Sequence, residues 1–170
     1  YWTGKKASQQ QNKKEKMFYS YPRSPKYEAE IQSLLLNVSP EYRKLVSGKV
    51  RKVGWTPEYG LFAAQINTDN GDLMLGPIWN EPRCGHSEKI DLLHHEIAHR
   101  VLKNNVHKLE DGTINQKMIG DAINEGKPFD TDDLENITDM VAAYIQPRYR
   151  EALREDMPAR YRLAKAIVED

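Results

Sequence analysis

Apolar residues recur at helical spacing in two segments of the chain, 87–102 and 132–146. They fall three or four positions apart, so in each segment they share one side of a helix. Thr131, just before the second segment, is a residue type that caps helix starts. We therefore expect two amphipathic helices that bury their apolar sides. The two stripes are Ile90, Leu93, Ile97 and Val101, and Leu134, Ile137, Val141 and Ile145.

Three short apolar runs, 49–55, 61–67 and 72–79, predict strands. Asn70-Gly71 stands between the second and third runs, and this pair is typical of a tight hairpin turn. Pro77 cannot donate a ladder hydrogen bond, so the third strand should lie at a sheet edge or end there. A free edge before helix 87–102 could pair with an extended peptide. Further helical segments are predicted at 27–36, 40–47, 114–124 and, interrupted by Pro158, 148–170.

Together these elements predict an α+β fold in which a small, mostly antiparallel sheet packs on helix 87–102. The chain has 170 residues, of which 39% are hydrophobic, and this is enough for one core. Residues 1–26 are rich in Lys and Gln and lack periodicity. We therefore expect a flexible basic arm or linker over 1–26 and one domain over 27–170.

The charge of the chain gives little indication of a partner, because 25 Lys and Arg balance 25 Asp and Glu. The arm is basic but has no cluster of arginines, so a solvated tail is favoured over a nucleic-acid binder. No segment is long enough to span a membrane, and no membrane partner is expected. Since the chain opens on Tyr1, we expect a soluble piece of a longer protein, cytoplasmic or delivered as a domain of a larger secreted protein. The single Cys84 excludes an internal disulfide.

Residues 95–99 read HEIAH and lie opposite the apolar stripe of helix 87–102. His95 and His99 are four apart, one helical turn, so both imidazoles can reach one metal ion. Glu96 lies about 100° further round the helix, where its carboxylate reaches a water beside the metal. The pattern predicts a Zn²⁺ cofactor with Glu96 as the catalytic general base. His94 falls at the edge of the apolar stripe, which predicts a hydrogen-bonded structural histidine.

A catalytic zinc takes three protein ligands and leaves one position open, so a third ligand must come from another segment. Glu135 and Asp139 are four apart on helix 132–146 and share one face beside its apolar stripe. Acidic groups in this position favour a positively charged partner. A solvated acidic face is the alternative interpretation of the same two residues.

The two motifs, HEIAH at 95–99 and Glu-x-x-x-Asp at 135–139, resemble the gluzincin branch of the zincin metallopeptidases. The resemblance covers roughly residues 60–147 and is similar in spacing to small phage-type repressor-cleaving peptidases and lethal-factor-like toxin catalytic domains. It implies a zincin-like fold, with Glu135 as the third zinc ligand and Asp139 as the residue that orients a motif histidine. In the aspartate-ligand branch an aspartate lies beside Gly-Thr, which makes Asp111 the alternative metal ligand.

Relatives in this class often use a tyrosine or histidine to donate to the oxyanion, and the candidates here are Tyr144, Tyr149 and His107. The resemblance implies a zinc-dependent endopeptidase that acts on a protein or peptide substrate. A toxin or effector role would add an inhibitor or immunity protein as a partner. The alternative function is a catalytically silent zincin scaffold that binds a protein. The presence of Glu96 disfavours this alternative, because a purely structural site needs no base.

Overall fold

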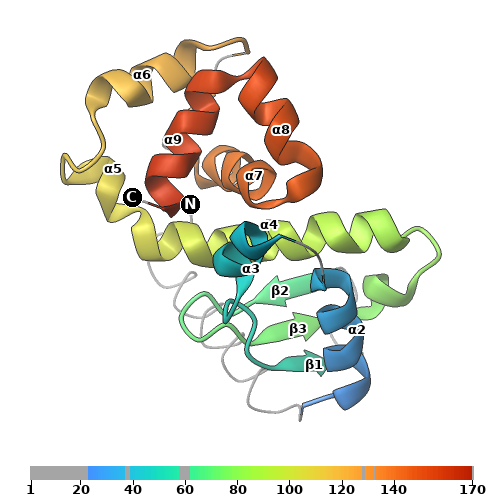
Figure 1. Cartoon of the computed structure of the whole chain (residues 1–170). Coiled ribbons are helices and arrows are strands. Elements are labelled where there is room, and N and C mark those ends of the chain that lie inside the picture. Colours follow the sequence, from blue (N-terminus) through green and yellow to red (C-terminus); the bar gives the residue numbers. More distant parts are fainter. Residues whose placement is uncertain (1–22, 37–38, 58–61, 128, 132, 170) are drawn as a thin grey trace.

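The computed structural model describes residues 23–36, 39–57, 62–127, 129–131 and 133–169 (Figure 1). The 20-residue helix α4 (His86–Asn105) crosses the middle of these residues. A three-stranded sheet lies along one side of α4, and the helices that follow α4 in the chain gather on the other side (Figure 1). The predicted α+β class is confirmed.

The sheet has the strand order β1-β3-β2, where β1 is Val53–Trp55, β2 is Ala64–Ile66 and β3 is Leu73–Leu75. Strands β2 and β3 pair antiparallel, which confirms the predicted hairpin, whereas β1 and β3 pair parallel. The expectation of a mostly antiparallel sheet is wrong, because β3 enters between the other strands and has one neighbour of each direction. Every residue of β3 is at most 1% exposed, as is typical of a strand covered on both faces.

The third strand ends just before Pro77, which confirms one of the two predicted alternatives, a strand that ends at this proline. Strand β3 ends at Leu75, and Pro77 opens the short 3₁₀ helix η1 (Pro77–Asn80), where it removes no ladder hydrogen bond. The third strand is therefore central, and the edge strand beside α4 is β2. The run predicted for β2 began at Leu61, which lies outside the described residues.

Arg100, one residue after the motif 95–99, lies beside the hairpin turn and joins α4 to the segment that leads into β1. Gly71 has a φ of 84°, a conformation that favours glycine, and a Cβ at this position would overlap the Arg100 guanidinium. Arg100 donates from Nη1 to the backbone oxygens of Lys49 at 2.5 Å and Gly48 at 3.1 Å. These contacts hold the sheet against α4 close to the histidines.

Helix α4 contributes side chains to two hydrophobic clusters. Leu93 is fully buried in the cluster of the sheet, together with Leu75 and Trp79. Ile97 and Val101 are buried in the cluster formed with the helices that follow α4. The predicted apolar stripe is confirmed, and α4 is covered on two sides.

Except for the short helix α5 (His107–Glu110), where no helix was predicted, the other helices stand close to their predicted positions. Pro147 and Pro158 each lie in the first turn of the helix that they open, which confirms that proline divides the last predicted segment. These helices are α2 (Pro25–Leu35), α3 (Pro40–Val46), α5 (His107–Glu110), α6 (Gln116–Asn124), α7 (Leu134–Ile145), α8 (Pro147–Asp156) and α9 (Pro158–Val168).

Helix α7 begins at Leu134, later than predicted. Its N-cap is Asp133, whose side chain accepts a hydrogen bond from the backbone N–H of Glu135 at 3.0 Å. The expected cap at Thr131 is therefore wrong, and Asp132 lies outside the described residues. The later start places Glu135 in the first turn, where the helix dipole favours a carboxylate.

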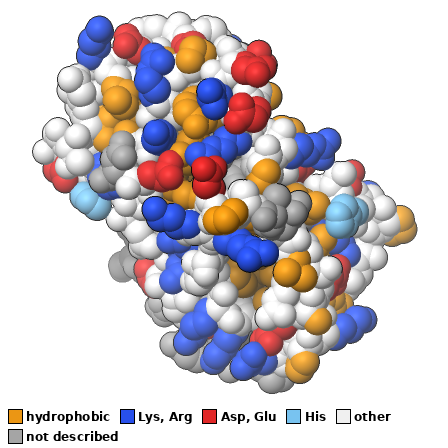
Figure 2. All heavy atoms as spheres, in the orientation of Figure 1, with side chains coloured by type: hydrophobic (Ala, Val, Ile, Leu, Met, Phe, Trp, Pro, Cys, Tyr) orange, Lys and Arg blue, Asp and Glu red, His pale blue; other side chains and the backbone are white. Residues whose placement is uncertain are grey.

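The folded part of the chain begins before the predicted boundary at residue 27. Ser24 caps α2, and Lys26 already lies in its first turn, while residues 1–22 of the predicted arm lie outside the described residues. Among the described residues, no helix combines the length and apolarity that a membrane crossing requires. Basic and acidic side chains are interspersed over the helical half of the face in Figure 2.

A buried histidine–tyrosine pair joins α4 to α3. His94 is 2% exposed, and its Nδ1 donates to the backbone oxygen of Ile90 at 2.7 Å. Its Nε2 therefore accepts from the Tyr42 hydroxyl at 2.6 Å. Burial lowers the pKa of His94 and raises the pKa of Tyr42 to about 12, so both stay neutral near pH 7. The predicted structural histidine is confirmed.

Replacing Tyr42 with Phe should lower the free energy of unfolding by about 1–3 kcal/mol, because the buried His94 Nε2 loses its donor. Tyr27→Phe is the matched control. The Tyr27 hydroxyl accepts from Asn80 Nδ2 at 2.8 Å in an exposed setting, and its loss should cost less than about 0.5 kcal/mol. Urea unfolding measures both variants, and equal costs would show that the buried pair adds no stability of its own.

Candidate metal centre

Helix α4 brings two imidazole nitrogens together on one face. His95 and His99 lie one turn apart, and their Nε2 atoms are 3.0 Å from each other. The two rings meet edge to face, with their centroids 4.6 Å apart. Their side chains are 27% and 28% exposed, so the nitrogens are supported by the protein and still open to solvent.

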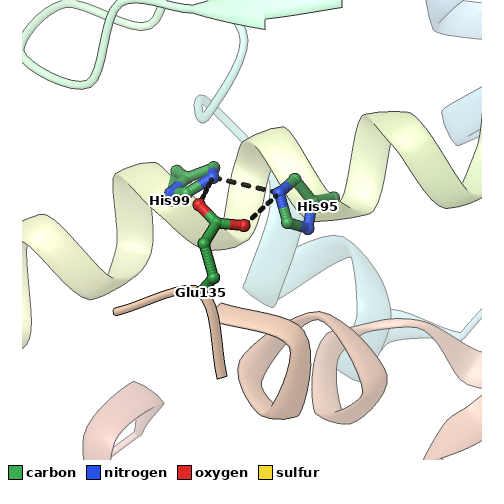
Figure 3. A group of neighbouring side chains, drawn as sticks. All are labelled: His95, His99 and Glu135. Atoms are coloured by element: carbon green, nitrogen blue, oxygen red, sulfur yellow. Dashed lines mark hydrogen bonds and ion pairs between the residues drawn. The ribbon is translucent and has the colours of Figure 1, made fainter. Parts of the chain in front are cut away.

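Glu135 completes the group from the first turn of α7. Its Oε2 lies 3.3 Å from His95 Nε2, and its Oε1 lies 3.1 Å from His99 Nε2. Figure 3 shows the three side chains converging from the two helices. In the part of the chain that the structure describes, these three residues form the one group of this kind that could hold a metal ion.

The other nitrogen of each imidazole is held by α7. His95 Nδ1 lies 3.2 Å from Asp139 Oδ1, and a carboxylate oxygen accepts, so Nδ1 is the donor. Thr138 Oγ1 donates to the backbone oxygen of Leu134 at 2.6 Å, so it accepts from His99 Nδ1 at 3.5 Å. Both Nδ1 atoms thus carry the proton, and both Nε2 lone pairs face Glu135.

The two imidazole nitrogens and the carboxylate of Glu135 fit a zinc ion in spacing and in chemistry. Zinc bonds of about 2.0–2.1 Å in a regular tetrahedron put neighbouring ligand atoms about 3.3–3.4 Å apart. Here the two Nε2 atoms are 3.0 Å apart, Glu135 Oε1 lies 3.1 Å from His99 Nε2, and Glu135 Oε2 lies 3.3 Å from His95 Nε2. Two lone pairs and a carboxylate at this distance repel one another unless a cation lies between them. Three ligands would leave one tetrahedral position for water.

Glu96 lies outside this group, as the HEIAH pattern predicts. Its Oε2 accepts a hydrogen bond from the backbone N–H of Ile66 at 3.0 Å. Ile66 is the last residue of β2, so the carboxylate lies between the edge strand and the metal helix. Glu96 thus has a fixed position on the sheet side of α4, whereas Glu135 reaches the histidines from the α7 side.

A cleft of about 640 Å³ begins at the centre and continues between α4 and α7. His95 and Asp139 line the end nearest the metal ligands, and Leu92, Ala142 and Tyr149 line the part beyond them. The cleft is lined mainly by apolar surface, so a substrate side chain could be buried beside the centre.

The remaining candidates lie in different surroundings. The side chain of Thr113 and its backbone N–H, the latter at 2.9 Å, donate to Asp111 and lower its pKa, and Asp111 is absent from the group of potential ligands. Its carboxylate therefore stabilises a turn, whereas the sequence had suggested it as the alternative metal ligand. Tyr149 lies in the cleft, where its hydroxyl donates to Asp91 at 3.4 Å.

Two proposed oxyanion donors lie outside the cleft. Tyr144 is fully buried, donates to Glu169 and accepts from Arg150 at 3.0 Å, so its hydroxyl belongs to the packing of α7 on the last helices. His107 opens α5, eight residues after His99, which corresponds to about 12 Å along a helix. The buried setting of Tyr144 argues against a donor role, and the role of His107 stays a prediction.

Sequence reasoning missed Thr138 as a partner of His99. Thr138 lies between Glu135 and Asp139 in the second motif, and the sequence pattern assigned it to neither the acidic face nor the apolar stripe. The structure buries it fully. A polar residue three positions after Glu135 on the same helix side was the available signal.

Comparison of this chain with protein-family models, curated proteins and solved structures found no match. The likeness to gluzincins is therefore carried by residues 95–99 and 135–139 alone. The chemistry of the centre has to be inferred from its own side chains and their geometry.

Zinc binding should need all three residues of the group. Purified protein offered Zn²⁺ should bind about one ion per chain, and His95→Ala and Glu135→Ala should each abolish binding at micromolar zinc. Asp139→Asn and Thr138→Val should weaken the affinity about ten- to a hundredfold, because each removes an acceptor that orients an imidazole. Calorimetric titration measures these affinities.

Asp111→Asn is the control for this series, because it removes a carboxylate without touching the group. Its zinc affinity should equal that of the wild type. If this variant loses zinc while Glu135→Ala retains it, the third zinc ligand is Asp111 and not Glu135.

Proposed function

We propose that this protein is a zinc-dependent endopeptidase with a zincin-like fold and a gluzincin-like ligand set. His95, His99 and Glu135 would hold the zinc, and Glu96 would be the catalytic base. The observation that carries the proposal is the convergence of both Nε2 atoms and the Glu135 carboxylate, with separations of 3.0–3.3 Å. These groups come from two motifs that lie 36 or more residues apart in the sequence, His99 to Glu135.

When bound, zinc would lower the pKa of a water to about 7 and polarise the scissile carbonyl. Glu96 would accept the proton of the attacking water and deliver it to the leaving amine. Asp139 and Thr138 would keep the Nδ1 protons on the two histidines, so that the lone pairs stay directed at the ion. Glu96 would thus move the proton of the water, and Asp139 and Thr138 would hold the protons of the imidazoles.

The edge strand β2 offers a place for the peptide backbone. The backbone groups of Ala63 and Asn67 are hydrogen-bonded to Gly76 and Asp72, on the β3 side of the strand. Backbone groups alternate in direction along a strand, so those of Ala64 and Ile66 point away from β3, towards the free edge. An extended substrate could pair along this edge by strand addition. Its scissile bond would then lie between β2 and α4, on the side where Glu96 reaches Ile66.

Two further parts of the proposal concern the oxyanion donor and the biological setting. Tyr149 is the candidate for the oxyanion donor that lines the cleft beside His95. A toxin or effector setting, with an inhibitor or immunity protein as partner, remains a prediction from the sequence resemblance. The protein or peptide substrate follows from the reaction class itself.

Glu96→Gln separates catalysis from binding. The amide keeps the size and the acceptor for Ile66 N–H but removes the basicity, so zinc affinity and unfolding midpoint should stay within error while turnover falls by about 10²–10⁴. Cleavage of a complex peptide mixture, read by mass spectrometry with zinc-loaded protein, provides the assay. Glu110→Gln, an exposed carboxylate on α5, is the matched control and should cleave like the wild type.

Two results would count against the peptidase. Wild-type protein that holds zinc but cleaves nothing would favour the silent scaffold. Equal turnover by wild type and Glu96→Gln would show that another group supplies the base.

A further inference from the structure

The cleft beside the centre exists because α7 presents small residues there. Helices α4 and α7 run antiparallel, since His99 meets Glu135, His95 meets Asp139, and Asp91 meets Gln146. Beyond Asp139, the positions of α7 that face the cleft are Ala142 and Ala143. Their methyl groups leave the space that larger side chains would fill, and Leu92 and Ile78 supply the opposite apolar wall.

One carboxylate lies in this cleft one turn from the metal ligands. Asp91 is four residues before His95, so Asp91, His95 and His99 form a single column on α4, with successive members about 6 Å apart along the axis. Asp91 accepts from Gln146 Nε2 at 3.0 Å and from the Tyr149 hydroxyl at 3.4 Å. Gln146 is 3% exposed, so the carboxylate has a fixed orientation at the far end of the cleft.

Both donors to Asp91 are uncharged, and no Lys, Arg or His among the described residues forms an ion pair with it. Arg83, the basic residue that lines the cleft, pairs with Glu81 at 2.5 Å. Lys89, close by on α4, pairs with Glu30 at 2.7 Å. The cleft therefore holds a carboxylate whose counter-charge the described part of the protein does not supply.

We propose that the cleft binds the side chain of a lysine or arginine next to the scissile bond, with its cationic head on Asp91. This inference rests on the proposed endopeptidase function and names its substrate class. The alkyl stem of such a side chain fits between Leu92 and Ala142, and the head reaches the carboxylate one turn from His95. An apolar side chain would cover Asp91 without neutralising it, and burying an uncompensated carboxylate is unfavourable.

The first test measures binding and needs no turnover. Zinc-loaded protein is titrated with N-acetylated hydroxamates that carry a lysine or a norleucine side chain, which differ only in the ammonium group. Each pair is prepared with the chelating group on the amino side and on the carboxyl side of the residue. In one of the two arrangements, the lysine compound should bind about ten- to a hundredfold more tightly.

Asp91→Asn should remove most of the preference for lysine and leave norleucine binding nearly unchanged. The charge-matched control is Asp121→Asn, at an exposed residue of α6, and it should keep the preference. Ala142→Leu fills the cleft without changing charge. It should weaken both compounds but not the glycine hydroxamate, so it tests the cleft even if Asp91→Asn is less stable. Equal binding of lysine and norleucine by the wild type would overturn the proposal.

The second test reads the cleaved bonds. Zinc-loaded protein is given a peptide library with acetylated amino termini, and the products are sequenced by mass spectrometry. Lys and Arg should be enriched at one position beside the cleaved bond, and Asp91→Lys should shift this position towards Asp and Glu. Enrichment of large apolar residues, or cleavage that needs a free amino terminus, would overturn the proposal while leaving the peptidase intact.

The two tests separate the proposals from each other. If no peptide is cleaved but the lysine hydroxamate is preferred, the peptidase proposal is wrong and the cation-binding cleft stands. If neither cleavage nor preference is found, both proposals are wrong.

Discussion

The antiparallel packing of α4 on α7 is the constraint on which the candidate centre depends. Ile97, Ile137 and Val141 are fully buried in the same cluster, and this contact sets how far each helix is rotated towards the other. A shift of one residue in either helix turns its side chains by about 100° and separates the nitrogens from Glu135. Apolar contacts between α4 and α7 thus decide which polar side chains meet at the centre.

The same packing also orients the ligands from behind. Asp139 and Thr138 take the two Nδ1 protons, and both belong to the helix that carries Glu135. Ligand and supporting groups therefore move as one rigid element, which is how metal sites keep their geometry. On its sheet side, α4 is joined by Arg100 to Lys49, ahead of β1, and by Glu96 to Ile66 of β2.

Much of this arrangement could be predicted from local patterns. The period of the apolar residues predicted α4 and α7, and Asn70-Gly71 predicted the β2–β3 hairpin. The motif at 95–99 brought its two histidines together because one helical turn is a local property. His94 was also predicted as structural, since its angle on the helix placed it beside the apolar stripe.

Other features depended on contacts between distant segments. The hydrophobic run 73–75 was compatible with an edge or a central strand, and only the pairing with β1 put β3 in the middle. Tyr144 looked suitable as a donor from its position in sequence, but its angle on α7 turns it into the core. The Asp91–Gln146 contact joins residues 55 positions apart, and no local period could indicate it.

The sequence by itself determined the elements and the pair of histidines, because helical period, turn residues and one-turn spacing act over a few positions. The tertiary structure decided that Glu135 and not Asp111 joins the histidines and that Thr138 supports His99. It also decided that Asp91 stands in a cleft where no basic residue of the described part of the chain pairs with it. These relations arise from how two helices dock through their buried side chains. Docking depends on shape and on the summed burial of many residues, which no short stretch of sequence contains.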